Sequence, residues 1–268
     1  MDKMSTIDRV KDIMTSPLRR PLIAGNWKMN LTLAQSAELA RAVKGGAAGA
    51  SGEIAVCVPF TALAAVAEVL KGSSVRLGAQ DCFWEASGAF TGEISNGMLV
   101  DAGCQMVIIG HSERRKLFND TDEAVNKKLA AALRAGLTPI VCVGETLEER
   151  ESQKTWRVLE KQLAGGLKGF APVDLSKVVI AYEPVWAIGT GKTASPAQAQ
   201  EAHLFARGQL GKLYGGNFSA GVRVLYGGSV TAENVDTLMS QPDVDGALVG
   251  GASLKKDSFL RIMGFKSA

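Results

Sequence analysis

The chain has 268 residues, of which 46% are hydrophobic, and its formal net charge is +3. This length allows one large α/β domain or two small ones, and the apolar fraction is enough to fill a sizeable core. The nearly balanced charge gives no reason to expect a nucleic-acid or membrane partner, and no apolar run is long enough for a transmembrane helix.

The first 20 residues differ from the rest of the chain. Residues 5–16 are weakly amphipathic, but they contain no long apolar stretch of the kind found in a secretory signal. Asp2, Asp8 and Asp12 argue against an organelle transit peptide. We therefore expect residues 1–20 to be an N-terminal extension, residues 21–268 to form the folded domain, and the protein to be cytoplasmic.

Eight short apolar runs follow, and amphipathic stretches such as residues 122–135, 155–163 and 196–213 separate them. Runs with little alternation are typical of strands buried on both faces. Eight alternating units predict a single α/β domain, a (β/α)8 barrel with eight parallel strands, in preference to an open doubly wound sheet with a G-x-G-x-x-G turn. The expected strands are residues 22–24, 54–58, 75–79, 106–109, 138–142, 178–182, 222–226 and 247–249.

Functional side chains of such a barrel should follow its strands, at the C-terminal face. Asn26 and Lys28 follow the first strand, and Lys28 lies between two apolar residues, where its ammonium could attract an anion. A lone lysine is more often a solvated surface residue. The loop 80–95, after the third strand, carries Phe83, Trp84 and Phe90, and three aromatic residues in one loop need burial.

The fourth strand is followed by His111, Ser112 and Glu113, which resemble the first turn of a helix. The partial positive charge of a helix N-terminus disfavours imidazolium, so we expect His111 to be neutral and able to donate one hydrogen bond. Glu113 is either a first-turn acid that suits the helix dipole or a partner for Lys28, and spacing does not separate the two. His203 lies within a helical stretch and receives no role.

Glu183 ends the sixth strand and precedes Pro184, which holds it in an extended conformation. A carboxylate fixed at a strand end, beside an apolar loop that could cover it, suits a general base. Glycine pairs follow the seventh and eighth strands, where barrels commonly bind phosphate. They are Gly227-Gly228, followed by Ser229, and Gly250-Gly251; Gly189 could supply a further N–H group.

Two nearby patterns do not complete a motif. Gly191-Lys192-Thr193 lacks the earlier glycine of a P-loop, because position 186 is Trp. Gly227-Gly228-Ser229 lacks the second glycine of a serine-hydrolase elbow, because position 231 is Thr. The four cysteines show no CxxC pair and the two histidines no metal-ligand spacing, so we expect free thiols, no metal and no cofactor.

Five segments together resemble the triosephosphate isomerase family, and the resemblance runs from about Leu22 to the end of the chain. They are AGNWKMN (24–30), GHSERR (110–115), AYEPVWAIGTGKTASP (181–196), YGGSV (226–230) and SQPDVDGALVGGASL (240–254). Family members often have Gly and Glu at the places of Asn119 and Asp120, a departure that could alter packing near the fourth strand.

The resemblance implies an enzyme, an aldose–ketose isomerase of glycolysis and gluconeogenesis, that interconverts dihydroxyacetone phosphate and glyceraldehyde 3-phosphate through an enediol(ate). It implies Glu183 as the base, His111 as the group that polarises the carbonyl, Lys28 as a positive charge and Asn26 as an orienting residue, supported by Ser112 and Glu113. The implied substrate-binding residues are Asn26, Lys28, Gly189, Ser229, Gly250 and Gly251. The implied lid is Pro184, Val185, Trp186, Ala187, Ile188, Gly189, Thr190, Gly191 and Lys192.

The family is typically homodimeric, and the loop 80–95 would then insert beside the partner's active site with Thr91 at its tip and Phe90 nearby. The alternative is that the aromatic side chains fold back on their own barrel. A second functional hypothesis is the same barrel with an added surface-binding role. A third is a different sugar-phosphate isomerase or an aldolase-type barrel. A Schiff-base aldolase would need a lysine inside a strand, and none of the eight runs contains one.

Overall fold

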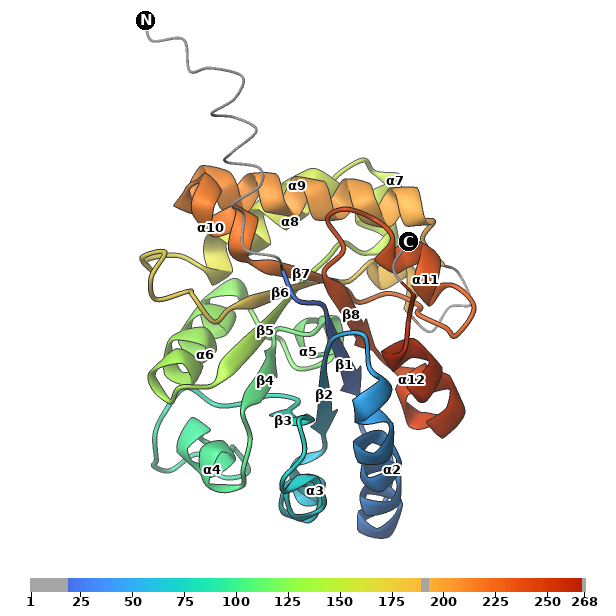
Figure 1. Ribbon diagram of the computed structural model, residues 1–268. Coiled ribbons are helices and arrows are strands. Elements are labelled where there is room, and N and C mark those ends of the chain that lie inside the picture. The colour runs from blue at the N-terminus through green and yellow to red at the C-terminus, as the bar shows by residue number, and fades with distance from the viewer. Residues whose placement is uncertain (1–18, 189–192, 267–268) are drawn as a thin grey trace, which may run out of the picture.

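The computed structural model describes residues 19–188 and 193–266. Within them, eight parallel strands form one closed barrel, in which β8 pairs with β1 (Figure 1). The strands are β1 (Leu22–Asn26), β2 (Glu53–Val58), β3 (Arg76–Ala79), β4 (Met106–Ile109), β5 (Thr138–Val143), β6 (Val179–Tyr182), β7 (Arg223–Tyr226) and β8 (Gly246–Val249). The predicted fold class is therefore confirmed, and the ends of the strands differ from the expected ones by at most two residues.

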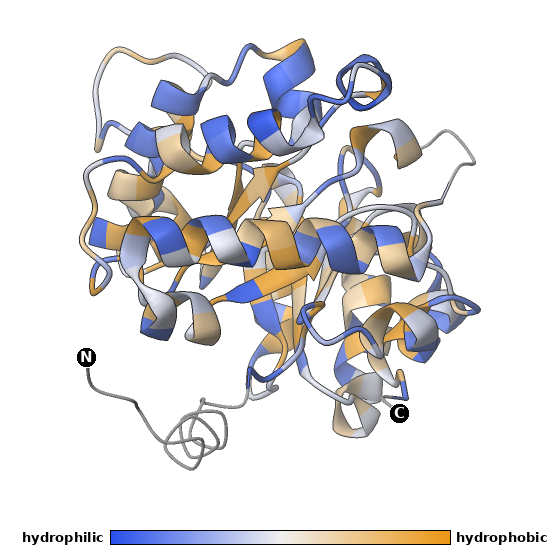
Figure 2. Cartoon of the chain, turned by 90° about the horizontal axis from the view of Figure 1, so that it is seen from above, coloured by the Kyte–Doolittle hydropathy of each residue, from blue (hydrophilic) through white to orange (hydrophobic). Residues whose placement is uncertain are grey.

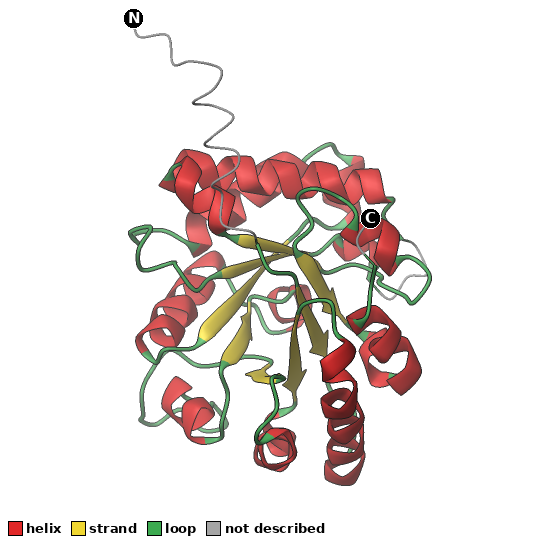
Figure 3. Ribbon diagram, in the orientation of Figure 1, coloured by secondary structure: helices red, strands yellow, loops and turns green. Residues whose placement is uncertain are grey.

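Helices surround the barrel and lie between successive strands (Figure 3). The described helices are α2 (Leu33–Gly46), α3 (Leu63–Leu70), α4 (Asn96–Asp101), α5 (Ser112–Leu117), α6 (Asp122–Arg134), α7 (Leu147–Glu151), α8 (Thr155–Gly166), α9 (Pro196–Tyr214), α10 (Gly216–Gly221), α11 (Val235–Met239) and α12 (Lys256–Met263). Short 3-10 turns are η1 (Ala47–Gly49), η2 (Phe60–Ala62), η3 (Val185–Ala187) and η4 (Gly251–Leu254).

The strands are apolar along their whole length because both of their faces are buried. In β4, Met106 and Ile108 pack inside the barrel, whereas Val107 and Ile109 pack under the helices. Each such side chain contributes roughly 1.5–3 kcal/mol when it is fully buried. Figure 2 shows largely apolar strands behind helices that carry both polar and apolar residues.

Helix α9 begins with a capping box that the sequence specifies. The Ser195 hydroxyl accepts the N–H of Gln198, the Gln198 side chain returns to the Ser195 N–H, and Pro196 occupies the first turn. On its inner face His203 is buried between the rings of Tyr182 and Tyr226. Its Nδ1 lies 3.1 Å from the carbonyl oxygen of Asp243.

The buried His203 should make the fold sensitive to mild acid. Burial lowers the pKa of this imidazole from 6.5 to about 4. Between these two values the unfolded chain binds a proton that the folded chain does not bind. His203 therefore reduces the free energy of unfolding as the pH falls through this window, by up to about 3 kcal/mol at its acid end.

Urea unfolding of the His203→Gln variant at pH 7.0 and pH 4.5 tests this expectation. Between pH 7.0 and pH 4.5 the free energy of unfolding should fall more for the wild type than for the variant. Leu204→Gln, an exposed change on the same helix, should leave the pH dependence as it is in the wild type. A His203→Gln difference that is equal at both pH values would contradict the prediction.

Over residues 19–188 and 193–266, no helix has both the length and the apolar character needed to cross a membrane.

Candidate active site

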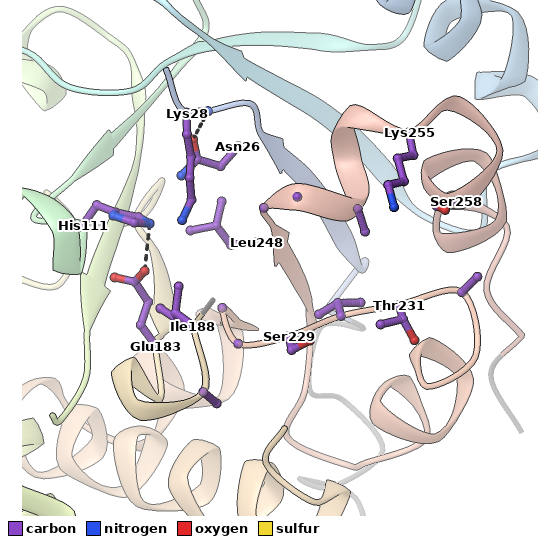
Figure 4. Close-up of a pocket in the computed structure, with 18 of the residues that line it drawn as sticks. Asn26, Lys28, His111, Glu183, Ile188, Ser229, Thr231, Leu248, Lys255 and Ser258 are labelled. Carbon is purple, nitrogen blue, oxygen red and sulfur yellow. Dashed lines mark hydrogen bonds and ion pairs between the residues drawn. The ribbon is translucent and has the colours of Figure 1, made fainter. Parts of the chain in front are cut away.

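A pocket opens at the C-terminal ends of the strands, with a volume of about 690 Å³. The predicted polar residues meet there although they lie far apart in the sequence (Figure 4). Asn26 and Lys28 come from the end of β1, His111 from the end of β4 and Glu183 from the end of β6. The glycine-rich segments after β7 and β8 line the other side of the pocket.

Glu183 is almost fully buried and is held by three hydrogen bonds. Its Oε1 lies 2.9 Å from His111 Nε2 and accepts from the Ser112 hydroxyl at 3.2 Å, and its Oε2 accepts from the Ser112 N–H at 2.8 Å. Burial raises the pKa of this carboxyl, but His111 and the Ser112 N–H lower it more, so the net direction is downward. The group is thus ionised at neutral pH, as a general base must be.

His111 is the N-cap residue of α5, and its Nδ1 accepts the N–H of Glu113 at 3.2 Å. In the neutral tautomer this leaves Nε2 as the N–H donor that faces Glu183. Burial lowers the pKa of the ring, but the Glu183 carboxylate raises it more, so the net pKa lies above the ordinary value. The helix terminus alone would lower this pKa, whereas Glu183, which that argument left out, raises it. The expected neutral ring stays a prediction.

Lys28 adopts a left-handed backbone conformation, with φ of 51°. Strained conformations of this kind cost free energy and persist where the surroundings hold them. Here the Asn26 side chain accepts the Lys28 N–H at 3.1 Å, and Gln80 donates to the Lys28 carbonyl at 2.9 Å. The Lys28 ammonium contacts Glu113 at 2.6 Å. Glu113 is therefore both a first-turn acid of α5 and the partner of Lys28, which combines the two interpretations left open.

The surroundings of the two glycine pairs differ in how much room they leave for a side chain. A Cβ on Gly227 would come within 2.9 Å of the Glu183 side chain, and one on Gly228 would meet the Tyr226 ring, so close packing requires glycine there. A Cβ on Gly250 would have Lys28 as its nearest neighbour, at 3.5 Å, and one on Gly251 would meet open space. Only the second pair presents unobstructed backbone to the pocket, at the beginning of η4.

The first half of the predicted lid, Pro184–Ile188, lies within the described residues, and η3 forms part of it. Gly189, Thr190, Gly191 and Lys192 lie outside them. The lid base is tied to Glu145, a residue that we did not single out from the sequence. Its Oε1 accepts from Trp186 Nε1 at 2.9 Å and from the Tyr182 hydroxyl at 3.1 Å, and contacts Arg150 at 3.0 Å.

Glu145 is expected to matter for stability. Removing its carboxylate would leave the buried Tyr182 hydroxyl without this acceptor, at a cost of about 1–3 kcal/mol, and would also remove one hydrogen bond of Trp186 and the ion pair of Arg150. Glu145→Ala should therefore lower the free energy of unfolding by at least about 1–3 kcal/mol in a urea titration. Glu148→Ala, an exposed change on α7, serves as the control, and an equal, small effect of both variants would contradict the prediction.

The aromatic loop after β3 packs partly on itself. The Phe83 ring lies 4.1 Å from that of Trp84 and 4.8 Å from that of Phe90, measured between ring centroids. Phe90 nevertheless remains 42% exposed, and Thr91 beside it is exposed as well. Packing within the loop thus buries part of its apolar surface. That a partner chain buries the rest stays a prediction.

The fold and this pocket define a class of protein: a (β/α)8-barrel enzyme with a carboxylate–imidazole pair and a lysine at its C-terminal face. The family model for triosephosphate isomerase matches residues 21–266. A triosephosphate isomerase from Geotalea uraniireducens is 57% identical over 92% of this chain and 99% of its own length. One from Endomicrobium trichonymphae is 56% identical, again over 92% of this chain, and 98% of its own length.

A solved structure of triosephosphate isomerase from Bartonella henselae superposes with a TM-score of 0.82 at 44% sequence identity. The alignment covers 91% of this chain and 97% of that one. The chain belongs to the triosephosphate isomerase family.

Proposed function

We propose that Glu183, His111 and Lys28 carry out in this chain the reaction of its family, the interconversion of dihydroxyacetone phosphate and glyceraldehyde 3-phosphate. This reaction gives the protein a place in glycolysis. The observation that carries the assignment of roles is the 2.9 Å approach of an ionised, buried carboxylate to His111 Nε2, in a pocket that also contains a lysine. The comparisons give no support to an added surface-binding role.

The reaction begins with a proton on the carbon beside the substrate carbonyl. Glu183 takes that proton, the C–H electron pair forms a carbon–carbon double bond, and negative charge moves to the carbonyl oxygen. The Nε2–H of His111 and the Lys28 ammonium stabilise this charge. His111 then gives its Nε2 proton to this oxygen and takes the proton of the neighbouring hydroxyl in return. Glu183 returns its proton to the former carbonyl carbon, and the carbon–oxygen bond of the neighbouring carbon becomes the new carbonyl. To reach the substrate, the carboxylate exchanges its hydrogen bonds with Ser112 and His111 for a position over the carbon.

The phosphate group of the substrate is proposed to bind between Ser229 and the backbone of Gly250 and Gly251. Support comes from the open space at Gly251 and from the start of η4, where N–H groups have no partner within the turn. Gly189, outside the described residues, would add an N–H group from the lid. Asn26 would orient the substrate, and lid closure over Pro184–Lys192 would exclude water from the intermediate.

We also propose a domain division, a cellular location and an oligomeric state for the protein. Residues 1–20 are an extension to a catalytic domain of residues 21–268; the family model, which matches residues 21–266, supports this division. The protein is a cytoplasmic homodimer, and the loop with Phe90 and Thr91 contacts the partner. The partly exposed aromatic cluster of this loop supports the dimer.

A coupled assay of the purified protein on glyceraldehyde 3-phosphate tests the function directly. The wild type should convert it to dihydroxyacetone phosphate, and the Glu183→Gln variant, which keeps the shape and loses the base, should be nearly inactive. Light-scattering mass measurement on the same samples should give twice the chain mass of 28.2 kDa. An inactive wild type would overturn the reaction, and a monomer mass would overturn the dimer.

A further inference from the structure

The N-terminal end of helix α5 supplies His111 and Glu113 to the pocket lining and Ser112 as a hydrogen-bond donor to Glu183, but the helix has no buried side chain of its own. His111 caps it, and Ser112 and Glu113 form its first turn, yet none of its six residues is buried. A helix of one or two turns has little stability by itself. Apolar packing therefore does not fix its direction, and other contacts must hold it in place.

Two arginines of α5 supply those contacts. Arg115 donates to the Gly110 carbonyl at 2.9 Å and to Asp122 at 2.7 Å. Arg114 places Nε 2.8 Å from an oxygen of Asp81 and 3.1 Å from an oxygen of Asp120. Asp81 and Asp120 are 5% and 8% exposed, so this second anchor reaches into the protein interior.

A buried lysine completes the second anchor. The Lys128 ammonium donates to Asp81 at 2.7 Å and to both oxygens of Asp120 at 3.0 and 2.9 Å, and the residue is only 2% exposed. We call Asp81, Asp120 and Lys128 the buried charge cluster. With Arg114 it contains two cations and two carboxylates, and loss of either cation would leave a buried negative charge uncompensated.

The cluster connects parts of the barrel that lie far apart in sequence. Asp81 follows β3, Asp120 lies in the connection from α5 to α6, and Lys128 belongs to α6, which packs against β4 and β5. Asn119 has a φ of 58°, a left-handed conformation that asparagine adopts more readily than most residues. This turn brings Asp120 back toward Arg114, whose carbonyl accepts the Asp120 N–H at 3.2 Å.

We propose that the buried charge cluster positions Arg114, and through Arg114 aims helix α5 so that His111 and Ser112 meet Glu183. The inference rests on the proposed function, because it assigns a positioning role for that reaction. The reaction rate should depend strongly on the orientation of α5, since a displacement of about 1 Å at reacting groups can lower a rate about 10²-fold. None of the cluster residues lines the pocket, so their effect should fall on turnover and leave substrate affinity nearly unchanged.

The first test is Lys128→Met, which removes the buried cation without touching α5. Measured per folded active site, with folded protein quantified by circular dichroism, kcat should fall about 10²-fold while KM stays within about threefold. Arg134→Met removes an exposed cation from the same helix and should change neither constant. A Lys128→Met protein with wild-type kcat per folded site would overturn the proposal.

The second test covers the case in which Lys128→Met does not fold, and does not depend on activity. Arg114→Met removes a partly exposed side chain and should leave the barrel folded. Hydrogen exchange should become at least about tenfold faster at the amides of Arg115 to Phe118 in this variant, whereas α8 amides should keep their rates. Unchanged exchange in α5 would refute the positioning role. If the wild type has no isomerase activity, the proposed function fails, and the exchange result still decides whether the cluster holds α5.

Discussion

Replacing Glu183 by aspartate is expected to lower kcat about 10³-fold while KM changes by no more than about threefold. The substitution keeps the charge but withdraws the carboxylate by about one carbon–carbon bond, about 1.5 Å. Proton transfer depends steeply on this distance, because the base must reach the carbon without strain. Steady-state kinetics on glyceraldehyde 3-phosphate provide the measurement.

Two matched variants separate position from charge. Glu183→Gln keeps the length and removes the base, so its kcat should be at least as low as that of Glu183→Asp. Glu233→Asp makes the same shortening at an exposed glutamate on the rim of the pocket and should be neutral. If Glu183→Asp retained more than a tenth of the wild-type turnover, Glu183 would not be the base.

The barrel could be predicted from the sequence because its strands have a simple physical signature. Residues 106–109 are apolar without alternation, and the structure buries Met106 and Ile108 on one face and Val107 and Ile109 on the other. The rule that polar groups follow strands then brought Asn26, Lys28, His111 and Glu183 to one face. Their convergence needed no distance information, because parallel strands place all their C-terminal ends together.

Contacts between side chains distant in sequence could not be predicted in the same way. The pKa of His111 is set by Glu183, which lies on a different strand, and the helix terminus alone suggested the opposite direction. Lys128 lies on an amphipathic helix where a lysine is normally exposed, and only the fold shows that it meets Asp81 and Asp120.

Glu145 is a different case, because its sequence signal was present. Glu145 lies two residues after the end of β5, and Glu183 directly follows β6, so the same rule about polar residues after strands selects both. The sequence singled out the glycines after β7 as a phosphate-binding signal, which explains only part of the need for glycine there. Gly227 and Gly228 line the pocket, yet the packing of Glu183 and Tyr226 against them is what excludes a side chain.

Lys28→Met is expected to lower kcat/KM about 10³-fold, with KM raised at least about tenfold. Methionine has nearly the same length, so the change removes the ammonium and leaves most of the packing. The ammonium lines the pocket together with His111 and Glu183, and Glu113 faces it at 2.6 Å. Without Lys28 the substrate, itself an anion, would meet the Glu113 carboxylate in the pocket, which adds repulsion to the lost attraction.

The double variant Lys28→Met/Glu113→Gln separates these two causes. Removing the carboxylate should lower KM relative to Lys28→Met, because the repulsion is gone, while kcat/KM should stay well below wild type, because no cation remains to stabilise the developing charge. Lys177→Met, an exposed change that precedes β6 at the other end of the barrel, should behave as wild type. A direct action of Lys28 on the substrate requires two results. The single variant must lose at least about 10²-fold in kcat/KM, and the double variant must recover part of the change in KM. Wild-type saturation kinetics for Lys28→Met would exclude Lys28 from the site.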